Sequence, residues 1–206
     1  SMEAYYMAKE GEYVLVKLEA RFEERPLPRV SIIDMREQLK KGNRLALSLE
    51  LREDLSQCLK KGEQAMLFLN RRGYAGFVSC RSCGHVMKCP HCDVSLSEHN
   101  GRKLICHYCG YETVKPDKCP VCSSPYIGGF KAGTQQIQQV VEKEFPEARV
   151  LRMDYDTTRA KGSYEKILSA FSRHEADILI GTQMIVKGHD FPDVTLVGIL
   201  AADLSL

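Results

Sequence analysis

The sequence has no long hydrophobic run. None of its apolar stretches approaches the ~20 residues that a membrane-spanning helix needs, and it does not open with the charged, apolar and small-residue segments of a secretory signal. Low-complexity tracts are absent as well. The sequence therefore predicts a cytoplasmic protein without membrane contacts. Because Ser1 precedes Met2 and the pattern starts within an element, we expect a segment of a longer protein.

A strong net charge is also missing. The formal charge is +2 at pH 7, with 44% hydrophobic and 27% charged residues, which is typical of a globular protein and excludes general disorder. If eight thiolates bind two Zn²⁺ ions, the net charge becomes about −2. The chain is thus not a general polyanion binder, and any nucleic-acid contact must come from individually placed groups.

What the sequence does contain is a regular α/β pattern. An amphipathic helix is predicted between Ser48, which can cap its start, and Gly62, which can end it. Two more helices are predicted from Thr134 to the residue before Pro146, and around residues 164–171. Such alternation with apolar runs predicts an α/β fold with a parallel sheet covered on both faces. Strand-like or continuous apolar runs cover residues 12–19, 30–35, 65–70, 149–154, 177–182 and 195–203.

Eight cysteines interrupt this pattern between Asn70 and Thr134. They form four C-x-x-C pairs in the spacing C-x2-C-x5-C-x2-C-x13-C-x2-C-x9-C-x2-C. In a reducing cytoplasm such pairs are more often metal ligands than disulfides, and four thiolates make a closed tetrahedral site of structural type. The spacing therefore predicts two Zn²⁺ sites, although the same tetrahedra accept iron. A thioredoxin-like redox role is disfavoured, because the pairs lack a strand-to-helix context.

The spacing favours a nested pairing of these turns. The two inner turns are joined by a predicted hairpin with an Asn100-Gly101 turn, and the outer turns then close the loop. The alternative is sequential pairing, which leaves only five residues between the first two turns. In the nested arrangement, the first zinc site consists of Cys80, Cys83, Cys119 and Cys122. The second consists of Cys89, Cys92, Cys106 and Cys109.

Simpler interpretations exist for the cysteine region. Zinc can be purely structural, because about fifty residues with few large apolar side chains cannot fold by burial alone. Cys58, on the apolar face of a predicted helix, is most simply a small buried side chain. Four histidines could replace a cysteine ligand, but eight thiols already fill two sites. We therefore expect these histidines on the surface: His85, His91, His99 and His107.

Two loops after predicted strands carry groups suited to phosphate. One contains FLNRRGY, and the other is the run GTQMIVKGHDFPDV. Open α/β sheets bind ligands at the carboxyl ends of their parallel strands, where Gly, Thr and Lys let donors approach phosphate oxygens. The simpler alternative is a turn that needs its glycines for conformational reasons.

Together with these loops, LPRVSIIDMRE, the cysteine series, AGTQQ and the order of all these motifs resemble the PriA family of bacterial replication-restart DNA helicases, over essentially the whole chain. The resemblance implies a superfamily 2 helicase, in which two RecA-like lobes hold ATP between them. It places the end of the first lobe at residues 1–28 and the second, incomplete RecA-like lobe at 29–77 and 132–206. Residues 78–131 would be an inserted double zinc ribbon.

The resemblance also implies roles for single residues. FLNRRG looks like helicase motif IV, and the run from Gly181 to Asp190 looks like motif V. Surface ion pairs for the arginines, and N-capping for Thr134, are the alternatives. Residues that would couple nucleotide to DNA are Arg71, Arg72, Gly188 and Asp190. Residues that would bind DNA are Thr134, Thr182 and Lys187, and candidate base-stacking residues are Arg102, Tyr108, Tyr111 and Tyr126.

Other parts of such a motor are missing from the sequence. It has no G-x-x-x-x-G-K-[ST], no DExx-type acid pair after a strand and no arginine-rich motif after LAADLSL. In related motors these parts hold the phosphates and Mg²⁺. We therefore expect a full-length parent to hydrolyse ATP with Mg²⁺ and to move 3′ to 5′ on DNA, whereas this chain alone is expected to be inactive.

The same resemblance suggests partners. These would be forked or single-stranded DNA, the single-stranded-DNA-binding protein and primosome loading proteins, in the bacterial cytoplasm and associated with the nucleoid. The rival hypothesis is a non-enzymatic module, in which the zinc ribbons bind DNA or a primosome protein and the α/β part only presents them. The small charge of the cysteine region argues against a strong electrostatic role.

Overall fold

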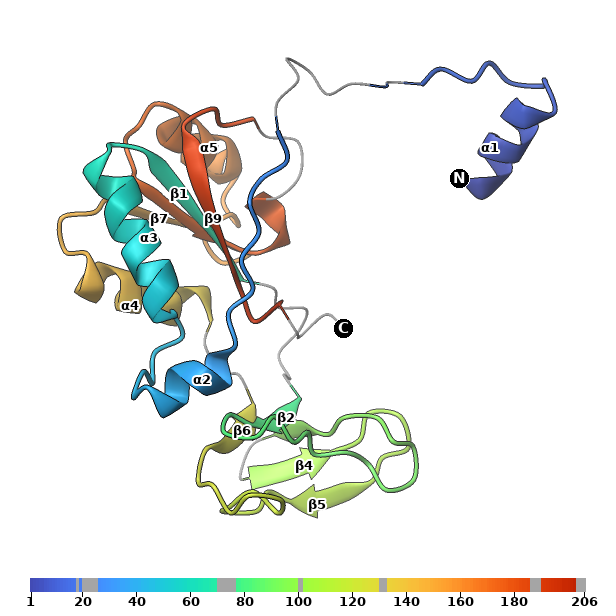
Figure 1. Cartoon of the computed structure of the whole chain (residues 1–206), viewed down its shortest axis with the longest axis vertical. Coiled ribbons are helices and arrows are strands. Elements are labelled where there is room, and N and C mark those ends of the chain that lie inside the picture. Colours follow the sequence, from blue (N-terminus) through green and yellow to red (C-terminus); the bar gives the residue numbers. More distant parts are fainter. Residues whose placement is uncertain are drawn as a thin grey trace. The chain divides into compact units, whose positions relative to one another are not determined.

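The chain divides into two compact units, Ser1–Ile32 and Ile33–Leu206, and each is considered by itself. The computed structural model describes residues 1–17, 19, 26–69, 77–99, 102–129, 133–185 and 190–202. Figure 1 shows the elements of both units. None of the helices within these ranges is both long and apolar enough to cross a membrane.

The first unit contains helix α1 (Met2–Lys9), which Ser1 caps by accepting a hydrogen bond from the Ala4 amide. No residue of α1 is buried. The described residues among 12–19 form no strand, and Val14 is 91% exposed. A strand needs a neighbour to satisfy its amides and carbonyls, and the described residues of this unit provide none. The strand predicted for this segment is therefore wrong.

A four-stranded parallel sheet forms the centre of the second unit. Its strands lie in the order β7-β8-β1-β9, and every pairing is parallel. The apolar runs predicted as strands after residue 64 supply all four, so the predicted α/β fold with a parallel sheet is confirmed. The strands are β1 (Gln64–Leu69), β7 (Val150–Met153), β8 (Ile178–Gly181) and β9 (Val194–Leu200).

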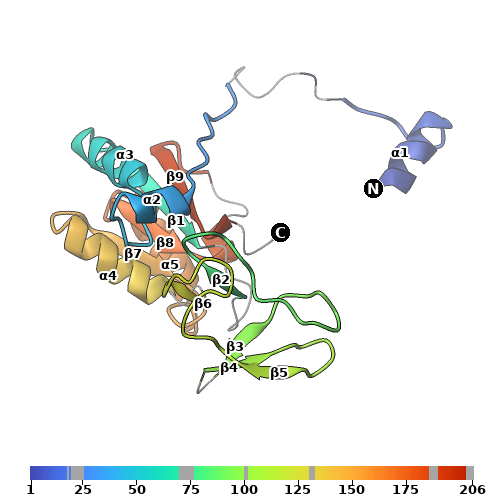
Figure 2. The ribbon, with the colours of Figure 1, turned by 60° about the horizontal axis from the view of Figure 1, so that its bottom comes forward.

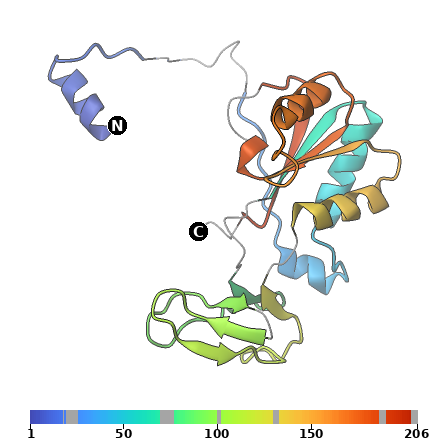
Figure 3. The ribbon, with the colours of Figure 1, turned by 180° about the vertical axis from the view of Figure 1, so that it is seen from behind.

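Helices cover both faces of this sheet. Successive residues of a strand point to opposite faces, so β8 gives Ile178 and Ile180 to one core and Leu179 to the other. The first core also contains residues of α3 and α4, and the second contains Phe171 of α5. The view from behind brings α5 to the front of the sheet (Figure 3). The helices are α3 (Leu49–Lys60), α4 (Thr134–Glu144) and α5 (Ser163–Ser172).

The ends of α3 follow the predicted signals. Ser48 accepts a hydrogen bond from the Leu51 amide at the start. Gly62 lies just beyond the end with φ +72°, a conformation that glycine adopts without strain. Cys58 is 4% exposed, which agrees with the prediction of a small buried side chain.

The apolar run at residues 30–35 leads into a short helix, α2 (Met35–Lys40), and does not form a strand. Ile32 is 94% exposed. Asp34 accepts a hydrogen bond from the Arg36 amide and so caps α2. The capping carboxylate, and the lack of a pairing strand among the described residues, explain why hydrophobicity alone does not make this run a strand.

The cysteine region lies between β1 and α4 in the sequence and forms two small antiparallel sheets (Figure 2). The hairpin predicted around Asn100-Gly101 is present as the β3–β4 pair, although these two turn residues lie outside the described residues. Among the described residues, the buried core of this region combines four cysteines with Val78, Leu96, Leu104 and Ile127. One sheet pairs β2 (Val78–Cys80) with β6 (Ile127–Gly129); the other contains β3 (Ser97–His99), β4 (Lys103–Ile105) and β5 (Glu112–Val114).

Candidate metal centres and the carboxyl edge of the sheet

Eight cysteines form two groups of four whose sulfur atoms all lie within 4.8 Å of one another. The pairing is the nested one. The first group is Cys80, Cys83, Cys119 and Cys122, and the second is Cys89, Cys92, Cys106 and Cys109.

The sulfur separations fit a tetrahedral metal ion. The Cys80 and Cys122 sulfur atoms lie 3.6 Å apart, and those of Cys89 and Cys109 are also 3.6 Å apart. A Zn–S bond of about 2.3 Å gives a tetrahedron with an edge of about 3.8 Å, whereas a disulfide bond is about 2.05 Å long. All the cysteines are free thiols. The two groups therefore fit two zinc ions in closed, structural sites.

One backbone turn occurs at all four C-x-x-C pairs. In each turn the amide four residues after the first cysteine donates to that cysteine's carbonyl, and the cysteine's amide donates to the carbonyl five residues on. The residue directly after the second cysteine has a positive φ, between 55° and 80°. The turn thus brings both thiols to one side, and it favours glycine or a short polar residue at that position. These residues are Gly84, Asp93, Gly110 and Ser123.

Backbone amides prepare one thiol of each group for ionisation. Amides of Cys109 and Tyr108 lower the pKa of Cys106 to about 7 against an opposing effect of burial. Burial alone would raise the pKa of Cys80, but the amides of Cys83 and Ser82 bring it to about 7. A bound cation stabilises thiolates further, so metal binding releases protons.

Glu98 connects the two small sheets. Its carboxylate accepts a hydrogen bond from Lys115 at 2.9 Å and another from the Gly129 amide at 3.4 Å. The side chains of Glu98 and Lys115 are only 7% and 18% exposed. A buried charge needs such partners. The ion pair joins β3 to the residue after β5, and the hydrogen bond from the Gly129 amide ties β3 to the end of β6.

The histidines of this region stand outside both cysteine groups. The imidazole of His91 packs edge-on against Tyr111, with ring centroids 5.3 Å apart. His99 and His107 are exposed, and their Nε2 atoms lie 3.1 Å apart. His85 is half-buried. Thus four sulfur atoms complete each group without an imidazole ligand.

Polar side chains gather at the carboxyl edge of the parallel sheet. In the register of β7 and β8, Met153 pairs with Gly181, so Asp154 and Thr182 follow on adjoining strands. Asp154 is 8% exposed and is held by Thr134 and by the Thr157 amide. Burial acts to raise the pKa of Asp154, but these hydrogen bonds hold it below its usual value.

Thr134 is the first residue of α4, and its hydroxyl donates to Asp154 Oδ2. The N-cap of α4 is Gly133, and no side chain caps the helix. The N-capping alternative for Thr134 is therefore wrong. Asp154 itself was missed by the sequence analysis. The D-Y-D-T-T run directly after a predicted strand could have indicated Asp154, because aspartate and threonine favour hydrogen-bonded turns at such positions.

Thr182 leads from β8 into a short 3-10 helix, η3 (Gln183–Ile185), and its carbonyl accepts from the Ile185 amide. Gly181 before it has no room for a side chain, since a Cβ atom would lie 2.7 Å from the Met153 carbonyl oxygen. Asp190 is exposed. The other residues proposed for this edge lie outside the described residues: Arg71, Arg72, Lys187 and Gly188.

Comparison with known proteins agrees with this geometry. Residues 89–113, which include all four cysteines of the second group, match the family model described as the PriA DNA helicase Cys-rich region (CRR) domain. The replication restart protein PriA of Bacillus subtilis is 54% identical over 100% of this chain. The chain belongs to the PriA family.

Other PriA proteins agree over similar lengths. The protein of Synechocystis is 50% identical over 91% of the chain, and that of Chlamydia pneumoniae is 40% identical over 100%. The chain spans 26%, 23% and 28% of these three relatives, which is about a quarter of each. The PriA match therefore covers the zinc region and the parallel sheet together, as one continuous segment.

Proposed function

We propose that the chain is the zinc-bearing part of an ATP-dependent 3′-to-5′ DNA helicase that recognises stalled or repaired replication forks and starts primosome assembly. The observation that carries this proposal is similarity to replication restart proteins along a chain that combines two four-cysteine groups with a parallel α/β sheet. ATP hydrolysis and Mg²⁺ binding belong in this proposal to the full-length protein.

The parallel sheet would be much of the second RecA-like lobe. In this division the lobe comprises residues 29–77 and 132–206, the zinc insertion comprises 78–131, and residues 1–28 end the first lobe. Helices on both faces of the sheet support the assignment, since nucleotide-binding α/β domains are built in this way. The boundaries of the small sheets, Val78 and Gly129, support the limits of the insertion.

The carboxyl edge of the sheet would be the surface that meets DNA and nucleotide. Thr134 and Thr182 would contact the DNA backbone, together with Lys187. Thr134 is hydrogen-bonded to Asp154, and Asp154 follows β7 where Thr182 follows the adjoining strand β8. This arrangement supports a surface shared by Thr134 and Thr182. Residues that would couple nucleotide hydrolysis to DNA movement are Arg71, Arg72, Gly188 and Asp190.

The proposed partners are those that a replication restart protein would need. They are forked or single-stranded DNA, the single-stranded-DNA-binding protein and primosome loading proteins, in the cytoplasm and near the nucleoid. A second candidate function is a non-enzymatic zinc-ribbon module that binds DNA or a primosome protein. It is favoured by the separate core of the cysteine region, which has its own buried residues and two sheets.

The two candidates differ in which change abolishes activity. In the full-length protein, Thr182→Ala is expected to lower DNA-stimulated ATP hydrolysis at least about tenfold while both zinc ions remain bound. The reason is that it removes a contact with the DNA backbone that couples DNA binding to ATP hydrolysis. Thr113→Ala, in β5 of the zinc region, is the matched control. If ATP hydrolysis is insensitive to Thr182→Ala and only chelation impairs fork binding, the binding module is the correct function.

A further inference from the structure

Two arginines from distant parts of the chain share one surface without an acidic partner. Arg44 follows α2, and Arg81 lies in the first C-x-x-C turn. Neither forms an ion pair with a described carboxylate. The other cations around α2 and the start of α3 are all paired: Arg36 with Asp34, Lys40 with Glu37, Lys41 with Glu50, and Arg52 with Glu144.

Two hydrogen bonds and one cation–π contact connect these two arginines with Tyr126. The Arg81 amide donates to the Tyr126 carbonyl at 2.8 Å, and the Arg81 guanidinium donates to the Arg44 carbonyl at 3.4 Å. The Arg44 guanidinium lies over the Tyr126 ring, 5.7 Å from its centroid. Arg44, Arg81 and Tyr126 therefore form one connected group, which we call the Arg44 surface.

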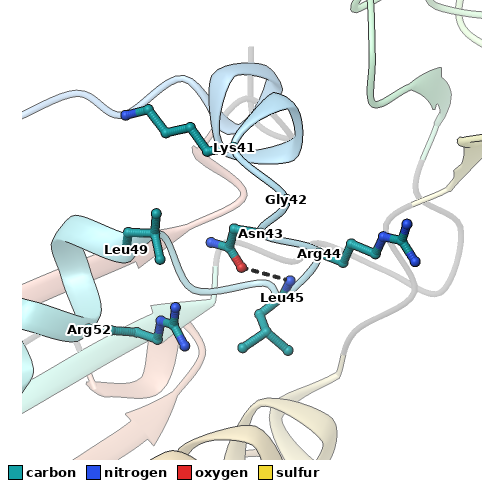
Figure 4. Close-up of a pocket in the computed structure, with 7 residues that line it drawn as sticks. All are labelled: Lys41, Gly42, Asn43, Arg44, Leu45, Leu49 and Arg52. Atoms are coloured by element: carbon teal, nitrogen blue, oxygen red, sulfur yellow. Dashed lines mark hydrogen bonds between the residues drawn. The ribbon is translucent and has the colours of Figure 1, made fainter.

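An open pocket borders this surface. Its volume is about 410 Å³, and Lys41, Asn43, Arg44 and Arg52 contribute its polar lining. Figure 4 shows the Arg44 side chain pointing away from Leu49 and Arg52. Asn43 is buried and holds the loop shape, because its side chain bonds the Leu45 amide and the Leu47 carbonyl. The loop that presents Arg44 is thus held by hydrogen bonds.

The chemistry of the group suits a nucleic-acid strand. A guanidinium without a carboxylate offers paired donors to phosphate oxygens. Tyr126 is 37% exposed, and because Arg44 lies over one face of its ring, the two side chains together form a planar, cationic group against which a base can stack. An isolated surface lysine provides charge alone, whereas this group combines charge, planar donors and an aromatic face.

We propose that Arg44, Arg81 and Tyr126 bind the sugar-phosphate backbone and a base of single-stranded DNA at the junction of the zinc region and the parallel sheet. This inference rests on the proposed function as a DNA-binding protein. It adds contact residues to those proposed for the carboxyl edge of the sheet, where Thr182 lies. Zinc at the first site would support this surface, since Arg81 belongs to the Cys80–Cys83 turn.

The test is the affinity of the chain for fluorescent single-stranded oligothymidine, measured by anisotropy over a range of salt concentrations. Arg44→Gln and Arg81→Gln should each reduce the slope of log affinity against log salt by about 0.7, and each should weaken binding about 3- to 10-fold at low salt. Tyr126→Leu should weaken binding without changing the slope, because it removes stacking and not charge.

Arg29→Gln is the matched control, because Arg29 is also an exposed arginine without a described ion pair. It should leave affinity and slope within about twofold of the unchanged chain. Bound zinc and thermal stability are measured for every variant to exclude unfolding. Equal losses for Arg29→Gln and the Arg44 surface variants would overturn the inference, and so would absence of binding by the unchanged chain. Neither outcome affects the ATPase test of the proposed function, which uses Thr182 in the full-length protein.

Discussion

The Thr134 hydroxyl donates a hydrogen bond to Asp154 Oδ2 and so joins the first turn of α4 to the end of β7. Both residues are buried, with 7% and 8% exposure. The Thr157 amide and the Arg152 guanidinium hold the same carboxylate from other directions. Asp154 therefore fixes the start of α4 at the sheet edge where Thr182 follows the neighbouring strand.

Removing the hydroxyl should destabilise this edge. Thr134→Val keeps the shape of the side chain but leaves the buried Asp154 carboxylate with one donor fewer. We expect the free energy of unfolding to fall by about 1–3 kcal/mol, because a buried charged group loses a hydrogen bond. Urea denaturation of the zinc-loaded chain, followed by circular dichroism, measures the change.

A double-mutant cycle separates this contact from other effects. Asp154→Asn alone should also destabilise, and the double variant with Thr134→Val should lose less than the two single losses together. The difference measures the coupling between the two side chains. Additive losses, within about 0.5 kcal/mol, would show that the hydrogen bond contributes nothing specific.

The low pKa of Asp154 makes stability depend on acid. Its ordinary value is 3.8 and the folded state lowers it. The ionised form is thus favoured by folding: the contribution is fully present above the unfolded pKa and is lost as the pH falls through the lower, folded-state pKa. Asp154→Asn should therefore flatten the decline of melting temperature below about pH 4. Asp156→Asn, at a side chain that is 72% exposed, is the control and should retain the decline.

Loss of one metal should unfold only part of the chain. Cys106→Ser removes a ligand of the second group, so we expect bound zinc to fall from about two equivalents to about one. Within residues 78–129, the amides of β3–β5 should lose protection from hydrogen exchange. The amides of β1 should keep their protection, because the core that contains β1 includes none of the eight cysteine ligands. Cys58→Ser, outside both groups, should retain two equivalents. Oxidised cysteine pairs in place of metal would contradict both sites.

The two metal groups could be predicted because their geometry is local. A C-x-x-C turn needs few residues. The hairpin between the two inner turns brings these turns together, so the two outer turns are left to pair with each other. The buried strands were equally visible, since β8 places alternate residues in two cores and is therefore apolar throughout. Local turns and periodic burial are properties that neighbouring residues determine.

The failures of prediction have a different cause. Residues 12–17 and 30–33 are hydrophobic enough for strands, but no described strand pairs with them. The contacts of Thr134 with Asp154, and of Arg44 with Tyr126, join segments that only the folded chain brings together. Hydrophobic pattern gives the tendency of a segment, whereas its partners depend on the tertiary arrangement.

Gly181 offers a test of how rigid the carboxyl edge is. A Cβ atom at this position would lie 2.5 Å from Ile185 Cγ2 and 2.7 Å from the Met153 carbonyl oxygen. The side chain of Ile185 can turn aside, but the carbonyl belongs to β7 and can move only if β7 and β8 separate. We expect Gly181→Ala to lower the free energy of unfolding by about 1–3 kcal/mol, measured by urea denaturation.

Gly128→Ala is the matched control, because the nearest side-chain atom would be 3.8 Å from the new Cβ, which is an ordinary contact. It should change stability by less than about 0.5 kcal/mol. If the two variants are equally stable, the strand ends separate without cost and Thr182 is not held in one position by β8. In that case the pairing of Met153 with Gly181 would not fix Asp154 beside Thr182. The arrangement of these two residues for DNA contact would then be formed by DNA binding and not by the free chain.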